Sequence, residues 1–147
     1  MDWDRKAWMS ILSKAGLEAV LSAWSDLGLD LDHEELRPAE TGLVMTRGRM
    51  GGTGDAFNLG EMTVTRCSVI LSDGRVGHAY VAGRSKEHAR IAAILDGLMQ
   101  GEEAGDVTAK VLEPLQAKLT EKREATARKA AATKVDFFAL SRSAKVK

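Results

Sequence analysis

The amino-acid sequence predicts an α+β fold: an antiparallel β-meander with packed helices, an N-terminal helix pair and a long C-terminal helix. Two observations carry this prediction. Apolar residues recur at helical spacing toward both ends of the chain, whereas nine of the 14 glycines lie between residues 42 and 83, among runs rich in β-branched residues. With 147 residues, the chain has the size of one domain, and we expect a single domain over residues 1–147.

Residues 1–29 are predicted to form the helix pair. Two sets of apolar residues follow the i, i+3, i+4, i+7 spacing of an amphipathic helix: Trp8, Ile11, Leu12 and Ala15, and then Leu17, Val20, Leu21, Trp24 and Leu27. Gly16 and Gly28 are well placed to end the first and the second helix. Two helices joined at one glycine form a compact corner, and its tryptophans are expected to pack in the core.

Residues 34–83 are predicted to form the meander, because strand signals replace helix signals after Pro38. The segment Leu43–Arg49 alternates as a strand does, and Met62–Leu71 is rich in β-branched residues. Asp73-Gly74 is a strong signal for a tight hairpin turn, so Gly77–Gly83 is the expected return strand. Consecutive strands joined by short turns imply antiparallel pairing.

Residues 85–133 are predicted to be helical. Ser85 is a good N-cap, and Pro114 must kink or divide the longer helical stretch. From Lys118 onward the apolar stripe thins to alanines, which make a stable helix but a poor core. Residues 135–140 are a candidate last strand whose two adjacent phenylalanines face opposite sides, so one of them needs cover from elsewhere. Residues 141–147 are expected to form a loose basic tail.

The composition argues against several kinds of chemistry. Cys67 is the only cysteine, so the chain cannot form an internal disulfide or hold an iron–sulfur cluster unaided. The three histidines are scattered without metal-ligand spacing, and no nucleophile motif is present. We therefore expect no catalytic residue, no metal and no cofactor bound by this chain itself. No apolar run approaches the roughly 20 residues of a membrane span, and no signal peptide is visible, so a cytoplasmic protein is expected.

The charges are unevenly distributed although the formal net charge is zero. Residues 1–40 hold four basic and nine acidic residues, a net charge of −5. Residues 117–147 hold nine basic and three acidic residues, a net charge of +6. This polarity suits oriented docking onto other proteins, while the simpler interpretation is a solvated charged helix.

The run over residues 47–54 carries the clearest functional signal. Arg47 and Arg49 are two residues apart, so on a strand both point to one face. Thr53 and three glycines that permit positive φ and close backbone approach follow them: Gly51, Gly52 and Gly54. Arginine beside such a loop favours an anion, either a phosphate or a partner's carboxylate. The run fits neither the P-loop nor the dinucleotide-binding pattern, and a plain turn with surface arginines stays open.

Three further polar residues lie on or beside the predicted strands: Glu61, Arg66 and Arg84. If the meander is right, we expect them to gather with Arg47 and Arg49 near one end of the sheet. A cluster of arginines and a carboxylate either binds a phosphorylated ligand or locks a subunit interface. The missing catalytic apparatus favours the interface.

A series of short motifs runs through the chain in a fixed order: Trp8-Met9, Glu40–Val44, Arg49–Gly54, Phe57, Gly60-Glu61, Thr65-Arg66, Val81–Arg84, Ala92–Asp96, Leu98–Gln100 and Val135–Phe138. Together they resemble the G subunit of the carbon–phosphorus lyase core complex. The resemblance spans nearly the whole chain, so it is far more specific than any one motif.

The resemblance implies a role in phosphonate catabolism as an accessory subunit. Members of this family belong to a cytoplasmic bacterial core complex with H, I and J subunits. In the family, the I subunit acts with the G, H and L subunits to replace the adenine of ATP by an alkylphosphonate, which gives a ribose phosphonate triphosphate. The J subunit then cleaves the carbon–phosphorus bond with S-adenosylmethionine and an iron–sulfur cluster. ATP and phosphonate are thus expected as substrates of the complex, and the radical centre is expected in a partner.

Three hypotheses stay open at this point. The chain is an obligate subunit without active chemistry, or it contributes to the active site by gripping the triphosphate or phosphonate with Arg47 and Arg49. The third is a stand-alone nucleic-acid-binding module that uses the helix pair and the basic tail. The net negative charge of the helix pair argues against the third, and neither a nucleic acid nor a membrane is expected as a partner.

Overall fold

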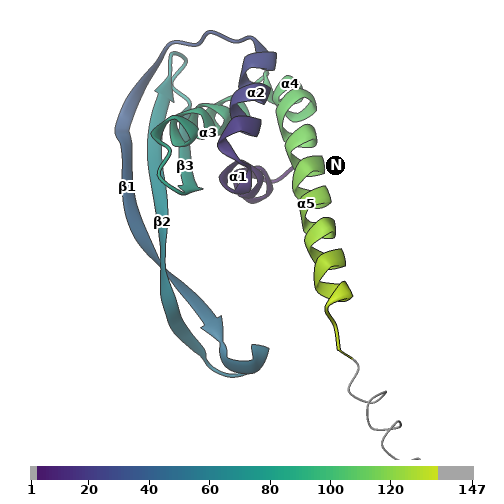
Figure 1. Cartoon of the computed structure of the whole chain (residues 1–147). Coiled ribbons are helices and arrows are strands. Elements are labelled where there is room, and N and C mark those ends of the chain that lie inside the picture. Colours follow the sequence, from purple (N-terminus) through teal and green to yellow (C-terminus); the bar gives the residue numbers. More distant parts are fainter. Residues whose placement is uncertain (1–2, 136–147) are drawn as a thin grey trace, which may run out of the picture.

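The computed structural model describes residues 3–135 and has the α+β architecture that the sequence predicts. The elements in chain order are α1 (Arg5–Lys14), α2 (Leu17–Leu27), β1 (His33–Arg49), the 3₁₀ turn η1 (Met50–Gly52), β2 (Ala56–Leu71), β3 (Val76–Ala82), α3 (Lys86–Leu98), α4 (Ala104–Val107), the π-helical turn η2 (Thr108–Leu112) and α5 (Glu113–Ala132). The strands form one antiparallel sheet in the order β1-β2-β3, with the helices on one face of it (Figure 1). Within residues 3–135, no helix is long and apolar enough to cross a membrane.

The N-terminal helix pair is confirmed. The Asp4 side chain accepts a hydrogen bond from the Ala7 N–H at 2.7 Å and so caps α1, while α2 ends at Gly28, which has a φ of 66°. Trp8 is buried in the core, and Trp24 packs against it in a half-buried position. The short corner between the two helices therefore places both apolar faces on one core.

The meander is also confirmed, although β1 begins before the strand signal does. β1 starts at His33 and continues through Pro38, where the pairing with β2 is irregular on both sides. Proline lacks an N–H group, so a strand accommodates it where the ladder is interrupted. The hairpin turn between β2 and β3 forms as expected, with the Gly74 N–H donating to the Leu71 carbonyl at 2.9 Å and a Gly74 φ of 89°.

α3 packs directly on the sheet and is almost completely buried. The Ser85 side chain caps α3, as expected, by accepting from the His88 N–H at 3.1 Å. β3 approaches α3 so closely that a Cβ added at Gly77 would lie 1.8 Å from the Ala93 carbonyl oxygen. Glycine at position 77 is therefore what allows the helix and the strand to meet.

The helical stretch after α3 is divided near Pro114, as expected. η2 ends at Leu112, and the Glu113 N–H bonds to the Thr108 carbonyl, which is the wider spacing of a π turn. This turn places Pro114 in the first turn of α5, where its missing N–H costs little. Only Leu115 of α5 is fully buried, and the helix runs away from the body (Figure 1).

The candidate strand over residues 135–140 and the tail over residues 141–147 lie outside the described residues, except for Val135. Val135 follows the end of α5, belongs to no strand and is exposed.

Candidate functional site

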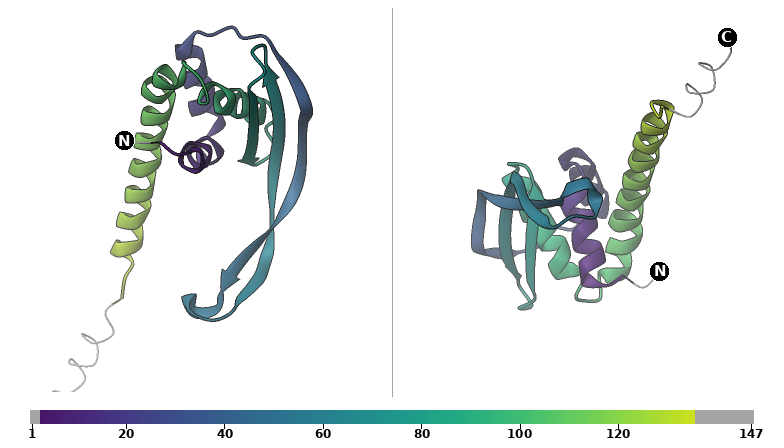
Figure 2. Two further views of the ribbon diagram at one scale, coloured as in Figure 1. Left: turned by 180° about the vertical axis from the view of Figure 1, so that it is seen from behind. Right: turned by 90° about the horizontal axis from the view of Figure 1, so that it is seen from below.

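β1 and β2 continue beyond β3 as a two-stranded arm. β3 ends at Ala82, which lies opposite Val64, whereas the pairing of β1 with β2 continues to Arg49 opposite Ala56. We call residues 42–62 the arm. It leaves the helix-covered body and curves beneath it (Figure 1), and the views from behind and below show the same projection (Figure 2).

The tip of the arm is a turn that needs its glycines. Gly51 and Gly52 have φ values of 60° and 80°, in the left-handed region that favours glycine. The Gly54 N–H donates to the Met50 carbonyl at 2.9 Å, and a Cβ added at Gly54 would also lie 2.9 Å from that oxygen. Thr53 ends the turn and is exposed. Two glycines thus provide the backbone conformation and the third permits close approach.

Arg47 and Arg49 lie on the same side of β1 next to this turn, as the sequence predicts. Arg49 Nη1 donates to the Gly54 carbonyl at 3.2 Å, and Arg47 Nη2 donates to the Ala56 carbonyl at 3.5 Å. Both side chains are exposed. A guanidinium has five N–H groups, so each arginine holds the tip and keeps donors for a ligand or a partner.

Of the other predicted site residues, Glu61 shares the arm with these arginines, whereas Arg66 and Arg84 lie apart from them. Glu61 lies within the arm opposite Met45, whereas Arg66 lies in the body, where it donates to Glu40 Oε1 at 2.6 Å and to the Tyr80 hydroxyl at 3.3 Å. Arg84 follows the end of β3. Ala56 at the tip and Arg66 are ten positions apart on β2, a distance of about 33 Å along an extended strand. The expected cluster is therefore spread along the sheet.

The arm also exposes large apolar side chains. Six of the nine large hydrophobic residues that are exposed among the described residues belong to it: Leu43, Met45, Met50, Phe57, Leu59 and Met62. Leu43 and Met45 are 61% and 62% exposed and lie on the side of β1 that carries Arg47 and Arg49. Exposed apolar groups that gather on one element mark a surface for binding another molecule.

Three kinds of group among the described residues bear on catalysis: metal ligands, the Cys67 thiol and a serine–histidine pair. No group of three or more His, Cys, Asp or Glu residues within 3–135 is placed to hold a metal. Burial raises the pKa of the Cys67 thiol, which is the opposite of what an activated nucleophile requires. Ser68 Oγ lies 2.9 Å from His78 Nδ1 on an exposed face, but no described carboxylate is hydrogen-bonded to this histidine ring. Among the described residues, the pair of Ser68 and His78 therefore lacks the third, acidic residue of a catalytic triad.

The sequence alone did not predict that Asp96 would be a buried, hydrogen-bonded carboxylate. Asp96 is fully buried and accepts hydrogen bonds from Arg5 Nη2 at 2.6 Å, Trp8 Nε1 at 2.9 Å and the His78 backbone N–H at 2.9 Å. The hydrogen bond to Asp96 raises the pKa of Arg5. The one signal was an acidic residue inside the apolar run of α3. Asp96 therefore joins α1, α3 and β3, and its role is structural.

The fold and the arm together define a class of protein: a small α+β chain whose sheet extends into a two-stranded arm that exposes arginines and large apolar side chains. The family model described as "Phosphonate metabolism protein PhnG" matches residues 3–143, and this chain belongs to that family. The match confirms the resemblance found in the sequence.

One relative is similar to this chain over most of its own length. The "Alpha-D-ribose 1-methylphosphonate 5-triphosphate synthase subunit PhnG" of Rhizobium meliloti (strain 1021) is 41% identical over 138 residues, which cover 94% of this chain and 88% of the relative. That relative is named as a subunit of a synthase.

Proposed function

We propose that this chain is a subunit, without active chemistry of its own, of an alpha-D-ribose 1-methylphosphonate 5-triphosphate synthase in the cytoplasm. The observation that carries the proposal is the 41% identity with a subunit of that synthase over 94% of the chain. In this role it works with I, H and L subunits. An oxygen of the alkylphosphonate forms a bond to C1′ of the ribose while the bond from C1′ to adenine breaks and adenine leaves.

The structure supports an accessory role in this exchange. The reaction needs groups that hold a triphosphate and that stabilise the departing adenine. The described residues offer exposed arginines at the arm tip but no activated acid, base or nucleophile, as the raised pKa of Cys67 illustrates. The S-adenosylmethionine and iron–sulfur chemistry that follows belongs, in this proposal, to a J subunit.

The arm is the surface by which the chain enters the complex. A two-stranded hairpin is marginally stable alone in water, and this one also exposes large apolar side chains. Packing against a partner would stabilise the hairpin and would also remove its apolar side chains from water. We assign the partner as the I subunit, because an accessory chain must reach the subunit that performs the exchange.

A second candidate role is direct contact with the triphosphate or the phosphonate at the arm tip. Arg47 and Arg49 favour it because their guanidinium groups lie on one side of β1, exposed and with free N–H donors. In that case the tip enters the partner's active site, and the arm is both an anchor and a ligand-binding element.

The experiment is reconstitution with I, H and L subunits, in which assembly and adenine release are measured separately. Arg49→Ala is compared with Arg37→Ala, which removes an arginine from β1 outside the arm that is 52% exposed. An interface role predicts that Arg49→Ala loses assembly. A phosphate-binding role predicts normal assembly but weaker use of ATP. Failure of the parent chain to co-purify with any of these subunits overturns the proposed function.

A further inference from the structure

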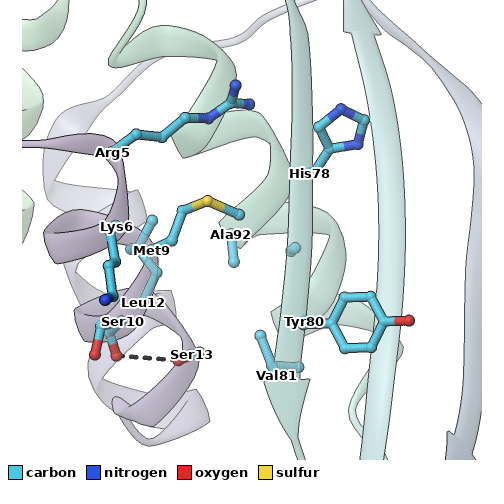
Figure 3. Close-up of a pocket in the computed structure, with 11 residues that line it drawn as sticks. Arg5, Lys6, Met9, Ser10, Leu12, Ser13, His78, Tyr80, Val81 and Ala92 are labelled. Atoms are coloured by element: carbon cyan, nitrogen blue, oxygen red, sulfur yellow. Dashed lines mark hydrogen bonds between the residues drawn. The ribbon is translucent and has the colours of Figure 1, made fainter.

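A groove lies between α1 and the outer edge of β3. Its volume is about 520 Å³, and α1 contributes Lys6, Met9, Ser10 and Ser13 while the apolar residues Leu12, Val81 and Ala92 form much of its floor. Figure 3 shows that the side chains of His78 and Tyr80 point away from α1, so β3 presents its backbone to the groove. The groove therefore has a largely apolar floor, with α1 on one side and a strand edge on the other.

The edge of β3 has free hydrogen-bonding groups. Two hydrogen bonds set the pairing pattern: the Leu71 N–H donates to the Arg75 carbonyl and the Gly83 N–H donates to the Thr63 carbonyl, both at 2.9 Å. The odd-numbered residues of β3 are therefore the ones whose backbone groups hydrogen-bond to β2. The even-numbered residues consequently direct their backbone groups outward.

The side chains of Asp96 and Gln100 hydrogen-bond to the outward backbone groups at only one end of this edge. Asp96 Oδ2 accepts from the His78 N–H at 2.9 Å, and Gln100 Nε2 donates to the Val76 carbonyl at 2.8 Å. Beyond His78, no residue within 3–135 pairs with the outward backbone groups of Tyr80 and Ala82. An open strand edge beside an apolar groove is the geometry that accepts an added strand.

We propose that residues 135–140 of a second copy of this chain bind here as a fourth strand. Their sequence, Val-Asp-Phe-Phe-Ala-Leu, has the β-branched and aromatic content of a strand. Successive side chains of a strand alternate between its two faces, so one phenylalanine enters the groove beside Met9 and the other lies next to Tyr80. Both phenylalanine side chains are then shielded from water, although they face opposite sides of the strand.

The reach of the chain points to a second copy rather than to the same molecule. Leu119 is the last residue of α5 that packs against the core. The fourteen residues from Leu119 to Ala132 carry the helix about 21 Å further. Val135 then lies exposed at the far end and does not line the groove. In Figure 1, α5 passes α1 on the side opposite β3, so a strand that starts at Val135 cannot lie along its own β3.

The exchange is reciprocal, since each copy offers one segment and one groove. Two copies related by a twofold axis satisfy both, which is the commonest symmetry of homodimers. The proposal concerns the chain by itself, and it does not depend on the synthase partners.

The test measures the oligomeric state of the purified full chain by light scattering across a dilution series, with a dimer as the expected result. Tyr80→Pro removes the N–H that faces the groove and leaves the ladder to β2 intact, because proline is tolerated on edge strands. Tyr80→Ala is the matched control, because it removes the same ring and its contact with Arg66 but keeps the N–H. We expect Tyr80→Pro to weaken dimerisation about tenfold or more relative to Tyr80→Ala.

A second pair of variants tests the segment. A chain that ends at Lys134 is expected to be monomeric, and a chain that ends at Leu140 is expected to dimerise like the parent. A mixture of the Tyr80→Pro chain with the chain that ends at Lys134 should form a heterodimer through the one remaining pair of segment and groove. Circular dichroism checks that each variant is folded.

A monomeric parent chain overturns the proposal, as does a chain ending at Lys134 that still dimerises. Equal dimerisation of Tyr80→Pro and Tyr80→Ala has the same consequence. If Tyr80→Pro does not fold, the truncated chains and Phe137→Asp with Phe138→Asp decide the question. A parent chain that is monomeric alone but whose Tyr80→Pro variant loses binding to another subunit also overturns the proposal, because a strand of that subunit then occupies the groove.

Discussion

At the scale of single residues, backbone conformation shapes the arm tip as much as charge does. Gly51 and Gly52 turn the chain at positive φ, and the close contact of Gly54 with Met50 completes the turn. Arg49 then bonds to the Gly54 carbonyl, so the position of its guanidinium depends on the glycines. The arginines and the glycines therefore form one unit, which explains why they are adjacent in the sequence.

Gly52→Val should damage the complex while leaving the domain folded. The space around Gly52 is open, so the cost is that of a side chain at a φ of 80°, about 1–2 kcal/mol. That is small against a typical domain stability of about 5–15 kcal/mol. Circular dichroism should match the parent, while co-purification with the I subunit or turnover of ATP should fall. Gly105→Ala, in α4 with open space around it, is the control. If Gly52→Val assembles and turns over like the parent, the tip is only a turn.

Asp96→Asn should lower the free energy of unfolding. An amide replaces one accepting oxygen with a donor, so one of the donors from Arg5, Trp8 and His78 is left facing it. Each buried polar group that loses its partner costs about 1–3 kcal/mol. The midpoint of urea unfolding should therefore shift clearly downward. Asp106→Asn, at an exposed position, should leave the midpoint nearly unchanged. Equal midpoints for the two variants would show that Asp96 does not join these elements energetically.

His88 should make stability depend on pH below neutrality. Burial lowers the pKa of His88 from its ordinary value of 6.5, while its Nε2 lies 2.8 Å from the Leu12 carbonyl. The unfolded chain therefore takes up a proton at a higher pH than the folded chain. The stabilising contribution is complete above the unfolded pKa and is lost as pH falls below it.

The measurement is the free energy of unfolding at pH 7.5 and at pH 5.5. The parent should lose more stability between these values than His88→Gln, which keeps an N–H donor but does not titrate. His33 and His78 are common to both chains and cancel in the comparison. The same loss in both proteins contradicts the assignment to His88.

At the scale of elements, the sequence predicted most of the fold because its signals are local. The helix pair, the Asp73-Gly74 hairpin and the Ser85 cap depend on residues close together in the chain, and all three are confirmed. The length of the arm was not predictable in the same way. It depends on where β3 stops relative to β2, at Ala82 opposite Val64, and this is a pairing between distant segments.

The candidate site shows the same division. The shared side of Arg47 and Arg49 follows from strand alternation alone, and it was predicted. The grouping with Arg66 and Arg84 required the register, and the structure places Arg66 in the body opposite Glu40. The buried role of Asp96 required knowledge of which residues α1 brings against α3. Local patterns in the sequence therefore predict local conformation, but they do not show which distant segments come into contact.

The exposed apolar side chains of the arm give an element-scale prediction. Leu43→Ser combined with Met45→Ser should leave the isolated chain folded, because both residues are more than 60% exposed. Full burial of such a side chain contributes about 1.5–3 kcal/mol. Only the exposed 61% of Leu43 and 62% of Met45 can be newly buried, so the pair should weaken binding to the partner subunit by about 2–4 kcal/mol. Calorimetric titration measures this difference.

Leu36→Ser is the matched control for the arm variant. Leu36 lies on the same strand but outside the arm, and it is 54% exposed. It should bind the partner like the parent chain. If Leu36→Ser weakens binding as much as the arm variant does, the interface is not confined to the arm.

At the scale of the whole molecule, two elements project from one body. The core is formed by α1, α2, α3, α4, η2, the start of α5 and the body of the sheet, while the arm and the rest of α5 extend from it in the same direction in Figure 1. The sequence places excess negative charge in residues 1–40 and excess positive charge in residues 117–147. Shape and charge are therefore both anisotropic, which suits a chain that meets its partners in one orientation.

The isolated chain should show no release of adenine from ATP and methylphosphonate. The reason is chemical: an exchange at C1′ needs groups that hold the triphosphate and groups that assist the leaving base, and the described residues offer exposed arginines for the first task but no activated acid or base for the second. The measurement is chromatographic detection of free adenine, with the purified chain alone and again after addition of I, H and L subunits. Release should appear only in the complete mixture, and omission of this chain from that mixture should abolish it. Clear turnover by the chain alone would instead place an active site within it, and the accessory role would have to be abandoned.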